Sequence, residues 1–255
     1  MRKVNVIFQL LLPAVLFSTV VPAQPKDKEE AFTVSLQKRP ASAEEPGVFI
    51  ISHEVQQWLP SQTAIIICDM WDKHWCTGAT QRVAEMAPYI NEVIAAGRQK
   101  GMLIVHAPSD CMEYYKDHPG RKLARKYYNK KYVRILGDGL LDSEKGAEWP
   151  IDQSDEGCED AGEAPHRAWT KQHSAIEIRD EDAISDSGAE LAGLFTARGI
   201  KNVILTGVHT NMCVIGRTFG LRNMVRLGMF CSAILPTQCT IQKCGHTYRT
   251  LPVTA

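Results

Sequence analysis

Hydrophobic positions along the chain follow two alternating periods. Residues 64–68 and 102–106 are nearly continuous apolar runs, which are typical of parallel strands buried on both faces of a sheet. Between them, apolar residues recur on one face of a predicted helix, at Val83, Met86, Ala87, Ile90, Val93 and Ile94. Pro88 falls inside this helix, so we expect either a kink or a later start.

The same alternation returns in the second half of the chain. Residues 175–178 and 202–208 are predicted strands, and Ser187 with Glu190 has the spacing of a capping box that begins a helix ending at Gly199. A further helix is expected after residue 208, with an inward stripe at Val214, Thr218, Leu221 and Val225. Strands that alternate with amphipathic helices predict a three-layer α/β/α fold with an open, mostly parallel sheet.

The N-terminal residues do not follow this pattern. Two basic residues precede a mostly apolar stretch at 4–21, and Val21 and Ala23 occupy the small-residue positions of a peptidase cleavage site. We therefore predict a signal peptide at 1–23, export to a periplasm or beyond, and no membrane association after cleavage. An uncleaved membrane anchor is the alternative. Residues 24–62 are expected to be a leader that contains short strands.

Charge is balanced overall but not locally. The chain of 255 residues has 29 basic and 29 acidic side chains, and 44% of its residues are hydrophobic, which excludes a disordered chain and a globally basic nucleic-acid binder. Residues 116–134 hold eight Lys/Arg with three tyrosines, and 152–163 hold six acidic residues. The basic run is compatible with nucleic-acid binding, but we favour a solvated helix or lid offset by the acidic loop, and no nucleic-acid partner.

Two residues at strand ends have chemistry typical of an active site. Thr210 is a good N-cap, which would place Cys213 in the first turn of a helix, where the helix dipole lowers the pKa of a thiol. Asp69 ends an apolar strand, where burial would raise its pKa and suit it to move a proton. A buried structural cysteine and a turn-capping aspartate would explain either residue alone. Their shared place at one edge of the sheet favours an active site.

These segments resemble a known family. The strand ending in Asp-Met-Trp-Asp at 69–72 and the Gly-Val-x-Thr-x-x-Cys-Val element at 207–214 are similar to the isochorismatase-like cysteine hydrolases, which include nicotinamidases and N-carbamoylsarcosine amidases. The resemblance implies a hydrolase domain at 63–228 with a charged insertion at 107–170. It also implies a Cys–Asp–Lys triad, in which Cys213 attacks a carbonyl, Asp69 moves the proton and a lysine supports them. By the same resemblance, a non-proline cis peptide joins Val208 to His209, and the amides of His209 and Cys213 form an oxyanion hole.

The lysine of that triad has two candidate positions. Lys171 precedes Ser174-Ala175-Ile176, one residue short of the family spacing. A register based on the helix at Ser187 would instead place Arg179 in this role, where it could act only electrostatically. We prefer Lys171.

Several features depart from the family or stay open. The metal-ligand spacing of nicotinamidases is missing after His106, and His74 with Cys76 is weak evidence for zinc, so we predict no metal and no cofactor. The tail at 229–255 holds one plausible strand at 230–235 but no helical periodicity beyond it, as a truncated C-terminus would. Apart from Cys213, seven cysteines remain, so at least one is free or pairs between chains, and a homo-oligomer is left open.

The leading interpretation is a cysteine hydrolase that cleaves a C–N bond of a small-molecule amide through a thioester intermediate. A thiol nucleophile favours this chemistry over the hydrolysis of an enol ether, which needs none. The alternative is a secreted, non-catalytic domain that binds a partner through its basic, Tyr-rich insertion.

Overall fold

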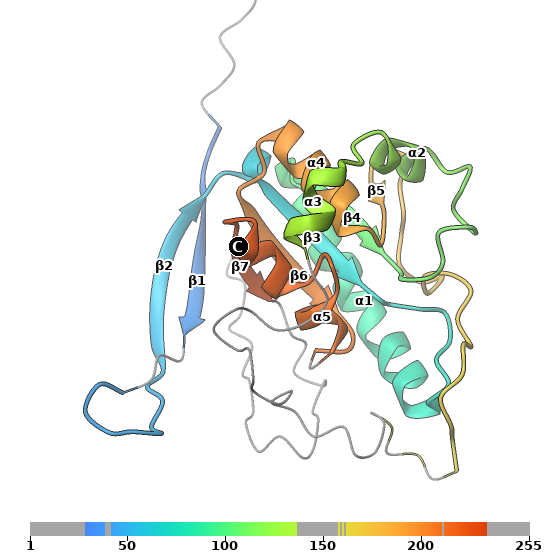
Figure 1. Cartoon of the computed structure of the whole chain (residues 1–255), viewed down its shortest axis with the longest axis horizontal. Coiled ribbons are helices and arrows are strands. Elements are labelled where there is room, and N and C mark those ends of the chain that lie inside the picture. The colour runs from blue at the N-terminus through green and yellow to red at the C-terminus, as the bar shows by residue number, and fades with distance from the viewer. Residues whose placement is uncertain are drawn as a thin grey trace, which may run out of the picture.

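A five-stranded parallel sheet lies at the centre of the molecule (Figure 1). The computed structural model describes residues 29–38, 42–136, 158, 160, 162–210 and 212–233. The strands stand in the order β5-β4-β3-β6-β7, and each neighbouring pair is parallel. Their bounds are β3 (Thr63–Cys68), β4 (Leu103–Ala107), β5 (Ala183–Ile184), β6 (Asn202–Gly207) and β7 (Phe230–Ala233).

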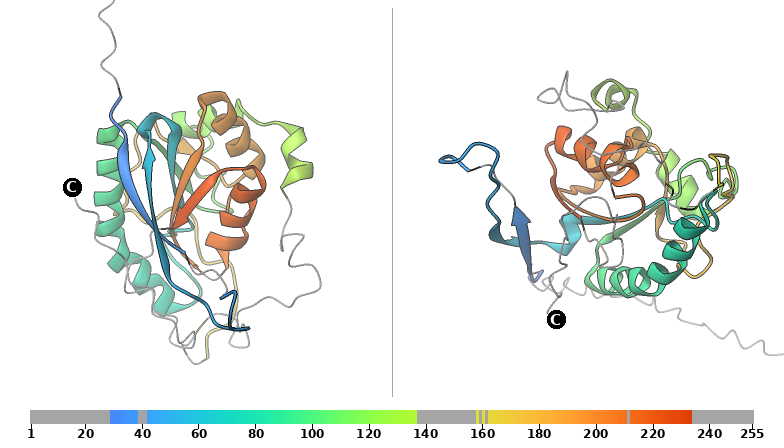
Figure 2. Two further views of the ribbon diagram at one scale, coloured as in Figure 1. Left: turned by 90° about the vertical axis from the view of Figure 1, so that its left-hand side faces the viewer. Right: turned by 90° about the horizontal axis from the view of Figure 1, so that it is seen from below.

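Helices cover both faces of this sheet (Figure 2). On one face, Ile65 and Ile67 of β3 pack in a cluster with apolar residues of α1 (Thr77–Lys100). On the other face, Ile66 packs in a cluster with apolar residues of α4 (Gly188–Arg198) and α6 (Leu221–Arg226). Side chains of successive strand residues point to opposite faces, so a strand covered on both sides must be apolar throughout. The three-layer α/β/α fold predicted from the sequence is confirmed.

A separate antiparallel hairpin precedes the sheet. β1 (Phe32–Lys38) pairs with β2 (Ser52–Trp58), and the short helix η1 (Pro60–Gln62) leads into β3. Alternate residues of β1, namely Phe32, Val34 and Leu36, are partly buried against the cluster on the α1 face. The predicted signal peptide at 1–23 lies outside the described residues. Within the described part of the chain, no helix combines the length and apolarity needed to cross a bilayer.

Helix α1 runs through Pro88 and begins earlier than the hydrophobic pattern indicated. It extends without a break over 24 residues from Thr77. Proline removes one backbone hydrogen bond and leaves the carbonyl of residue 84 without its usual partner. Pro88 and residue 84 both lie on the exposed side of the helix, where water can bind that carbonyl. The prediction of a later start was therefore wrong.

The strand expected at 175–178 is not a strand. The Asn91 side chain bonds to the backbone of this segment on both sides, accepting from the amide of Glu177 at 2.9 Å and donating to the carbonyl of Ala175. Ile176 is buried, so an apolar alternating segment is present, but its backbone is bound by a helix side chain and not by a neighbouring strand. β5 follows further along, at Ala183–Ile184, and pairs with β4.

The helix expected after β6 is two short helices. α5 (Cys213–Gly216) has only four residues, and its N-cap, Met212, makes no side-chain capping bond, so the prediction that Thr210 caps it was wrong. The helical backbone is interrupted between α5 and α6. In this interruption the Thr218 hydroxyl accepts a hydrogen bond from the amide of Gly188 at 2.9 Å, at the start of α4. The expected inward stripe fails at Val225, which is exposed.

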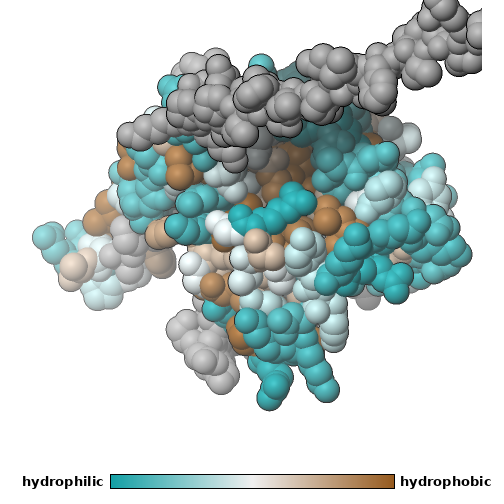
Figure 3. Space-filling model, turned by 90° about the horizontal axis from the view of Figure 1, so that it is seen from above, coloured by the Kyte–Doolittle hydropathy of each residue, from teal (hydrophilic) through white to brown (hydrophobic). Residues whose placement is uncertain are grey.

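Helix α4 begins and ends where the sequence predicts, and the basic segment at 116–134 contains two short helices. Ser187 accepts a hydrogen bond from the Glu190 amide at the start of α4, and Gly199 ends it with φ +68°, as the sequence indicated. The segment predicted as a solvated helix or lid forms α2 (Pro119–Arg125) and α3 (Lys130–Ile135). α3 packs on α4, where the Tyr132 hydroxyl lies 2.6 Å from that of Thr196. Seen from above, hydrophilic residues cover most of the visible face, with hydrophobic ones nearer its centre (Figure 3).

Candidate active site

Asp69 stands at the carboxyl end of the central strand. It has a positive φ of 48°, a conformation that aspartate adopts more readily than most residues, and its carbonyl accepts from the amide of Trp71 at 2.8 Å. The chain thus turns sharply and leaves the Asp69 carboxyl fully buried. One carboxylate oxygen accepts from the amide of Ser109 at 2.8 Å, and the other from Nε of Arg217 at 3.0 Å. Both oxygens of Asp69 are therefore held in place.

Cys213 reaches the same place from the neighbouring strand. β6 ends at Gly207, where φ is +121° and a Cβ would lie 2.0 Å from the carbonyl oxygen of Cys68, so only glycine allows the two strand ends to approach this closely. The Val208–His209 peptide bond that follows is cis, as the family resemblance implied. The Cys213 thiol and the Asp69 carboxyl each influence the pKa of the other, so the two side chains are close neighbours. The structure thus places the two predicted residues beside each other.

The electrostatics of the thiol differ from the sequence-based expectation. Burial, followed by the charge of Asp69, raises the pKa of Cys213 to about 12, although Arg217 acts in the opposite direction. The expected lowering of this pKa by a helix dipole was wrong, because α5 is a single turn and the sulfur is desolvated. Burial also raises the pKa of Asp69, against the effects of Arg217 and the Ser109 amide. Cys213 therefore rests as a neutral thiol beside a buried carboxyl.

Arg217 is a site residue that the sequence analysis missed. Its Nε bonds to Asp69, and the charges of Asp69 and Cys213 are among the influences that raise its pKa. Arg217 follows Cys213 by four residues, the spacing of one helical turn, and this spacing was the available signal. The guanidinium is the cation that touches the candidate base.

The two candidate basic residues contact other side chains. Nζ of Lys171 stands 5.4 Å from the centre of the Tyr114 ring, and the backbone of Lys171 pairs with Asp72. Arg179 forms an ion pair with the exposed Glu177. The role of Lys171 as the triad lysine stays a prediction, and the pairing of Arg179 does not favour the alternative.

His209 contributes both backbone and ring to the site. Its carbonyl accepts from the amides of Met212 at 3.0 Å and Val214 at 3.1 Å, on either side of Cys213, which places it beside the predicted nucleophile, as a member of the predicted oxyanion hole must be. Burial lowers the pKa of His209 and of His74 to about 4, so both rings are neutral at pH 7. Nε2 of His209 is buried and has no hydrogen-bond partner among the described residues.

Aromatic rings pack beside Cys213. The rings of Trp71 and Trp169 stack with centroids 4.3 Å apart, His74 stacks on both, and the His74 ring lies 5.0 Å from that of His209. Trp169 belongs to the charged insertion, so this segment reaches the site. The sequence offered no signal for the cluster, because its rings come from three separate segments.

The cysteines divide into two groups. Cys68, Cys111, Cys213 and Cys231 are free thiols, whereas Cys76 forms a disulfide with Cys158. Cys239 and Cys244 lie outside the described residues. His74 and Cys76, which the sequence offered as possible metal ligands, therefore have other partners. The Cys76 sulfur is in the disulfide, and Nδ1 of His74 accepts a bond from the Cys76 amide at 3.1 Å.

Comparisons with known proteins give weak structural likenesses. No protein-family model matches the chain, and no curated protein matches it. A cysteine hydrolase from Pseudomonas syringae pv. phaseolicola 1448A is similar over 69% of this chain and 71% of its own, with 16% sequence identity and a TM-score of 0.38. An isochorismatase family protein from Desulfovibrio vulgaris subsp. vulgaris str. Hildenborough is similar over 69% of this chain and 94% of its own, with 13% identity and a TM-score of 0.28.

Proposed function

We propose that this protein is a cysteine hydrolase that cleaves the carbon–nitrogen bond of a small amide. The observation that carries the proposal is the placing of a partly buried thiol next to a buried carboxyl at the carboxyl ends of two adjacent parallel strands, Cys213 after β6 and Asp69 after β3. In open parallel sheets this edge is where ligands bind. A nucleophile beside a base that other groups hold in place is the arrangement that nucleophilic catalysis needs.

The raised pKa of Cys213 determines how the reaction would begin. A neutral thiol is a poor nucleophile, so Asp69 must take its proton as the sulfur bonds to the substrate carbonyl carbon. The carbonyl oxygen becomes an oxyanion, which the backbone amides of His209 and Cys213 would bind. Asp69 then gives the proton to the amide nitrogen, the C–N bond breaks, and an amine and a thioester remain.

The second half of the cycle reverses these roles. Asp69 takes a proton from water as the water oxygen attacks the thioester carbon. The C–S bond breaks, Cys213 regains its proton, and a carboxylic acid leaves. Arg217 stays charged throughout and favours the ionised form of Asp69 before each attack.

The test is a screen for amide hydrolysis on a panel of small primary amides and N-carbamoyl compounds, with released ammonia or amine as the signal. Wild type should turn over at least one substrate, and Cys213→Ala and Asp69→Asn should lose that activity while keeping the wild-type circular dichroism spectrum. Cys231→Ser, which alters a free thiol on the edge strand β7, is the matched control and should keep full activity.

Mass spectrometry of the quenched reaction provides an independent readout. A substrate acyl group should add its mass to the peptide that contains Cys213 and to no other cysteine peptide. Equal background rates in wild type and Cys213→Ala across the whole panel would contradict the proposal and favour the non-catalytic, partner-binding alternative.

A further inference from the structure

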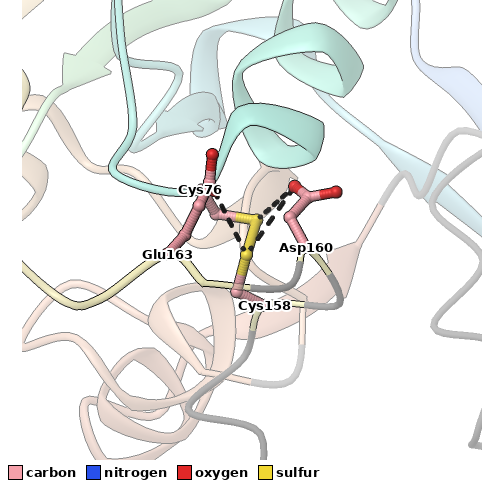
Figure 4. A group of neighbouring side chains, drawn as sticks. All are labelled: Cys76, Cys158, Asp160 and Glu163. Atoms are coloured by element: carbon pink, nitrogen blue, oxygen red, sulfur yellow. Dashed lines mark hydrogen bonds between the residues drawn. A yellow bond between two sulfur atoms is a disulfide. The ribbon is translucent and has the colours of Figure 1, made fainter.

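A second group of reactive side chains lies outside the candidate active site, at the start of α1. It consists of Cys76, Cys158, Asp160 and Glu163, and the sulfur and carboxylate oxygen atoms of all four lie within 4.8 Å of one another (Figure 4). Cys76 directly precedes α1, and the other three come from the end of the charged insertion. Residues more than 80 positions apart in the chain thus meet in one cluster.

The two carboxylates are oriented by the first turn of α1. The Glu163 carboxylate accepts from the amide of Thr77 at 2.7 Å and from its hydroxyl, and the Asp160 carboxylate accepts from the amide of Gly78 at 2.6 Å. A Cβ on Gly78 would lie 3.0 Å from that Asp160 oxygen, so glycine leaves room for this approach. Since Cys76 makes no side-chain capping bond, these two acidic residues provide the capping bonds to this turn.

The spacing between sulfur and oxygen atoms matches that of a tetrahedral metal site. An Asp160 oxygen lies 3.3 Å from the sulfur of Cys76 and 3.7 Å from that of Cys158, and a Glu163 oxygen lies 3.6 Å from the Cys158 sulfur. Zinc bonds of about 2.3 Å to sulfur and about 2.1 Å to oxygen place ligand atoms roughly 3.4–3.8 Å apart in a tetrahedron. The three sulfur–oxygen separations fit one zinc ion, and reduction must let the two sulfurs, which are bonded to each other in the disulfide, move to about 3.8 Å apart.

The redox state of the two cysteines decides whether such a site exists. In the disulfide both sulfurs are bonded to each other and neither is a thiolate, so only the carboxylates could bind a cation. Reduction gives two thiols, and with Asp160 and Glu163 they supply two soft and two hard ligands, a set that zinc accepts. The amides of Thr77 and Gly78 would then act as outer partners that hold the carboxylates in position.

We propose that Cys76, Cys158, Asp160 and Glu163 form a zinc site when the two cysteines are reduced, and that their disulfide closes it. A dithiol reductant supplies two electrons and two protons, which convert the disulfide to two thiols, and the reductant becomes a cyclic disulfide. Zinc binding then releases the two thiol protons as the two Zn–S bonds form. The prediction of no metal from the sequence considered His74 with Cys76 and did not include the partners that the insertion supplies.

Cobalt(II) is the probe, because its absorption reports thiolate ligands and tetrahedral geometry directly. The full-length protein is reduced with a dithiol, freed of reductant without oxygen, and titrated with Co²⁺ and then with Zn²⁺. The reduced protein should bind one Co²⁺ with thiolate-to-cobalt charge-transfer bands that Zn²⁺ removes, and the oxidised protein should show none. Cys158→Ser removes one of the two thiolate ligands and should weaken cobalt binding and the charge-transfer bands, whereas Cys231→Ser, the matched control, should leave both unchanged.

Two variants keep both cysteines and test the rest of the site. Asp160→Asn removes a ligand and should weaken binding. Thr77→Ala removes only the bond from the Thr77 hydroxyl to Glu163, while the backbone amide still donates, and should weaken binding by about 10-fold. Charge-transfer bands of unchanged intensity and unchanged cobalt affinity in Cys158→Ser would assign the metal to other thiols and overturn the proposal, as would a reduced wild type that binds no cobalt. Because no measurement here depends on turnover, this result stands apart from the test of Cys213.

Discussion

Replacing Asp69 with asparagine tests whether its carboxylate acts as a base or only as a neighbouring charge. With a pKa of about 12, only roughly one Cys213 thiol in ten thousand is ionised at pH 8, against about one in four for an exposed cysteine. Alkylation that waited for the free thiolate would therefore be about 2,500-fold slower than that of an unstructured cysteine peptide. Proton transfer to Asp69 during attack avoids this limit.

The two roles predict opposite outcomes. If Asp69 is the base, Asp69→Asn should slow the alkylation of Cys213 at pH 8 by roughly 100-fold, the scale of general-base assistance. If Asp69 is only a charge, its removal should lower the pKa of Cys213 and speed the reaction, because that charge raises the thiol pKa.

The assay is iodoacetamide labelling with a mass-spectrometric readout of each cysteine peptide. Buried Cys68, whose pKa is raised far above the ordinary value by burial, is the internal reference for a thiol that reacts without a general base. Asp72→Asn is the matched control, since Asp72 bonds to Thr170 and Lys171 and not to the thiol. Cys213 labelling that is unchanged or faster in Asp69→Asn would refute the assignment of Asp69 as the base.

Three further predictions follow from contacts in and around the site. Arg217→Gln should lower kcat/KM by roughly 10- to 100-fold at the acid end of the pH profile, because loss of a charged hydrogen bond worth about 1.5–3 kcal/mol raises the pKa of Asp69. A larger, pH-independent loss in Lys171→Met alone would instead support Lys171 as the basic member of the triad. Gly207→Ala should lower the free energy of unfolding, measured by urea titration, by at least about 2 kcal/mol. Gly101→Ala, whose added methyl meets no atom within 4 Å, is the control and should lose less. Equal losses would contradict the close approach of β3 and β6. Hydrogen bonds from His106, Arg98 and the Arg179 amide outweigh the effect of burial and lower the pKa of Asp182 to about 2. The stability that this carboxylate contributes is fully present above its unfolded pKa near 4, and the free energy of unfolding should fall by about 2 kcal/mol as the pH drops to 2. Asp182→Asn should lack this pH dependence.

The sequence predicted the layers of the fold because its central strands are buried on both faces. Continuous apolar runs mark β3, β4 and β6 directly, and the chemistry at their ends followed from the geometry of parallel sheets. This reasoning placed Asp69 and Cys213 at one edge of the sheet, and in the structure the two side chains are neighbours there.

What the sequence did not reveal depends on contacts between distant segments. The apolar stretch at 175–178 looks like a strand locally, but Asn91 binds its backbone from 84 residues away. The pKa of Cys213 is set by burial in the folded chain, which a helix-dipole argument cannot include. Arg217 and the partners of Cys76 were visible as residue types but not as neighbours.

The Cys76–Cys158 bond has a consequence for a chain that has been cut. Asp69 and Cys76 precede the stretch of chain between α3 and Cys158. Cys158 stands at the end of that stretch, and Cys213 follows it. A single proteolytic nick between residues 136 and 158 would put the two reacting side chains on different fragments. The disulfide would still join those fragments, so nicked protein should migrate as one species until a reductant is added, and only then could its two halves separate.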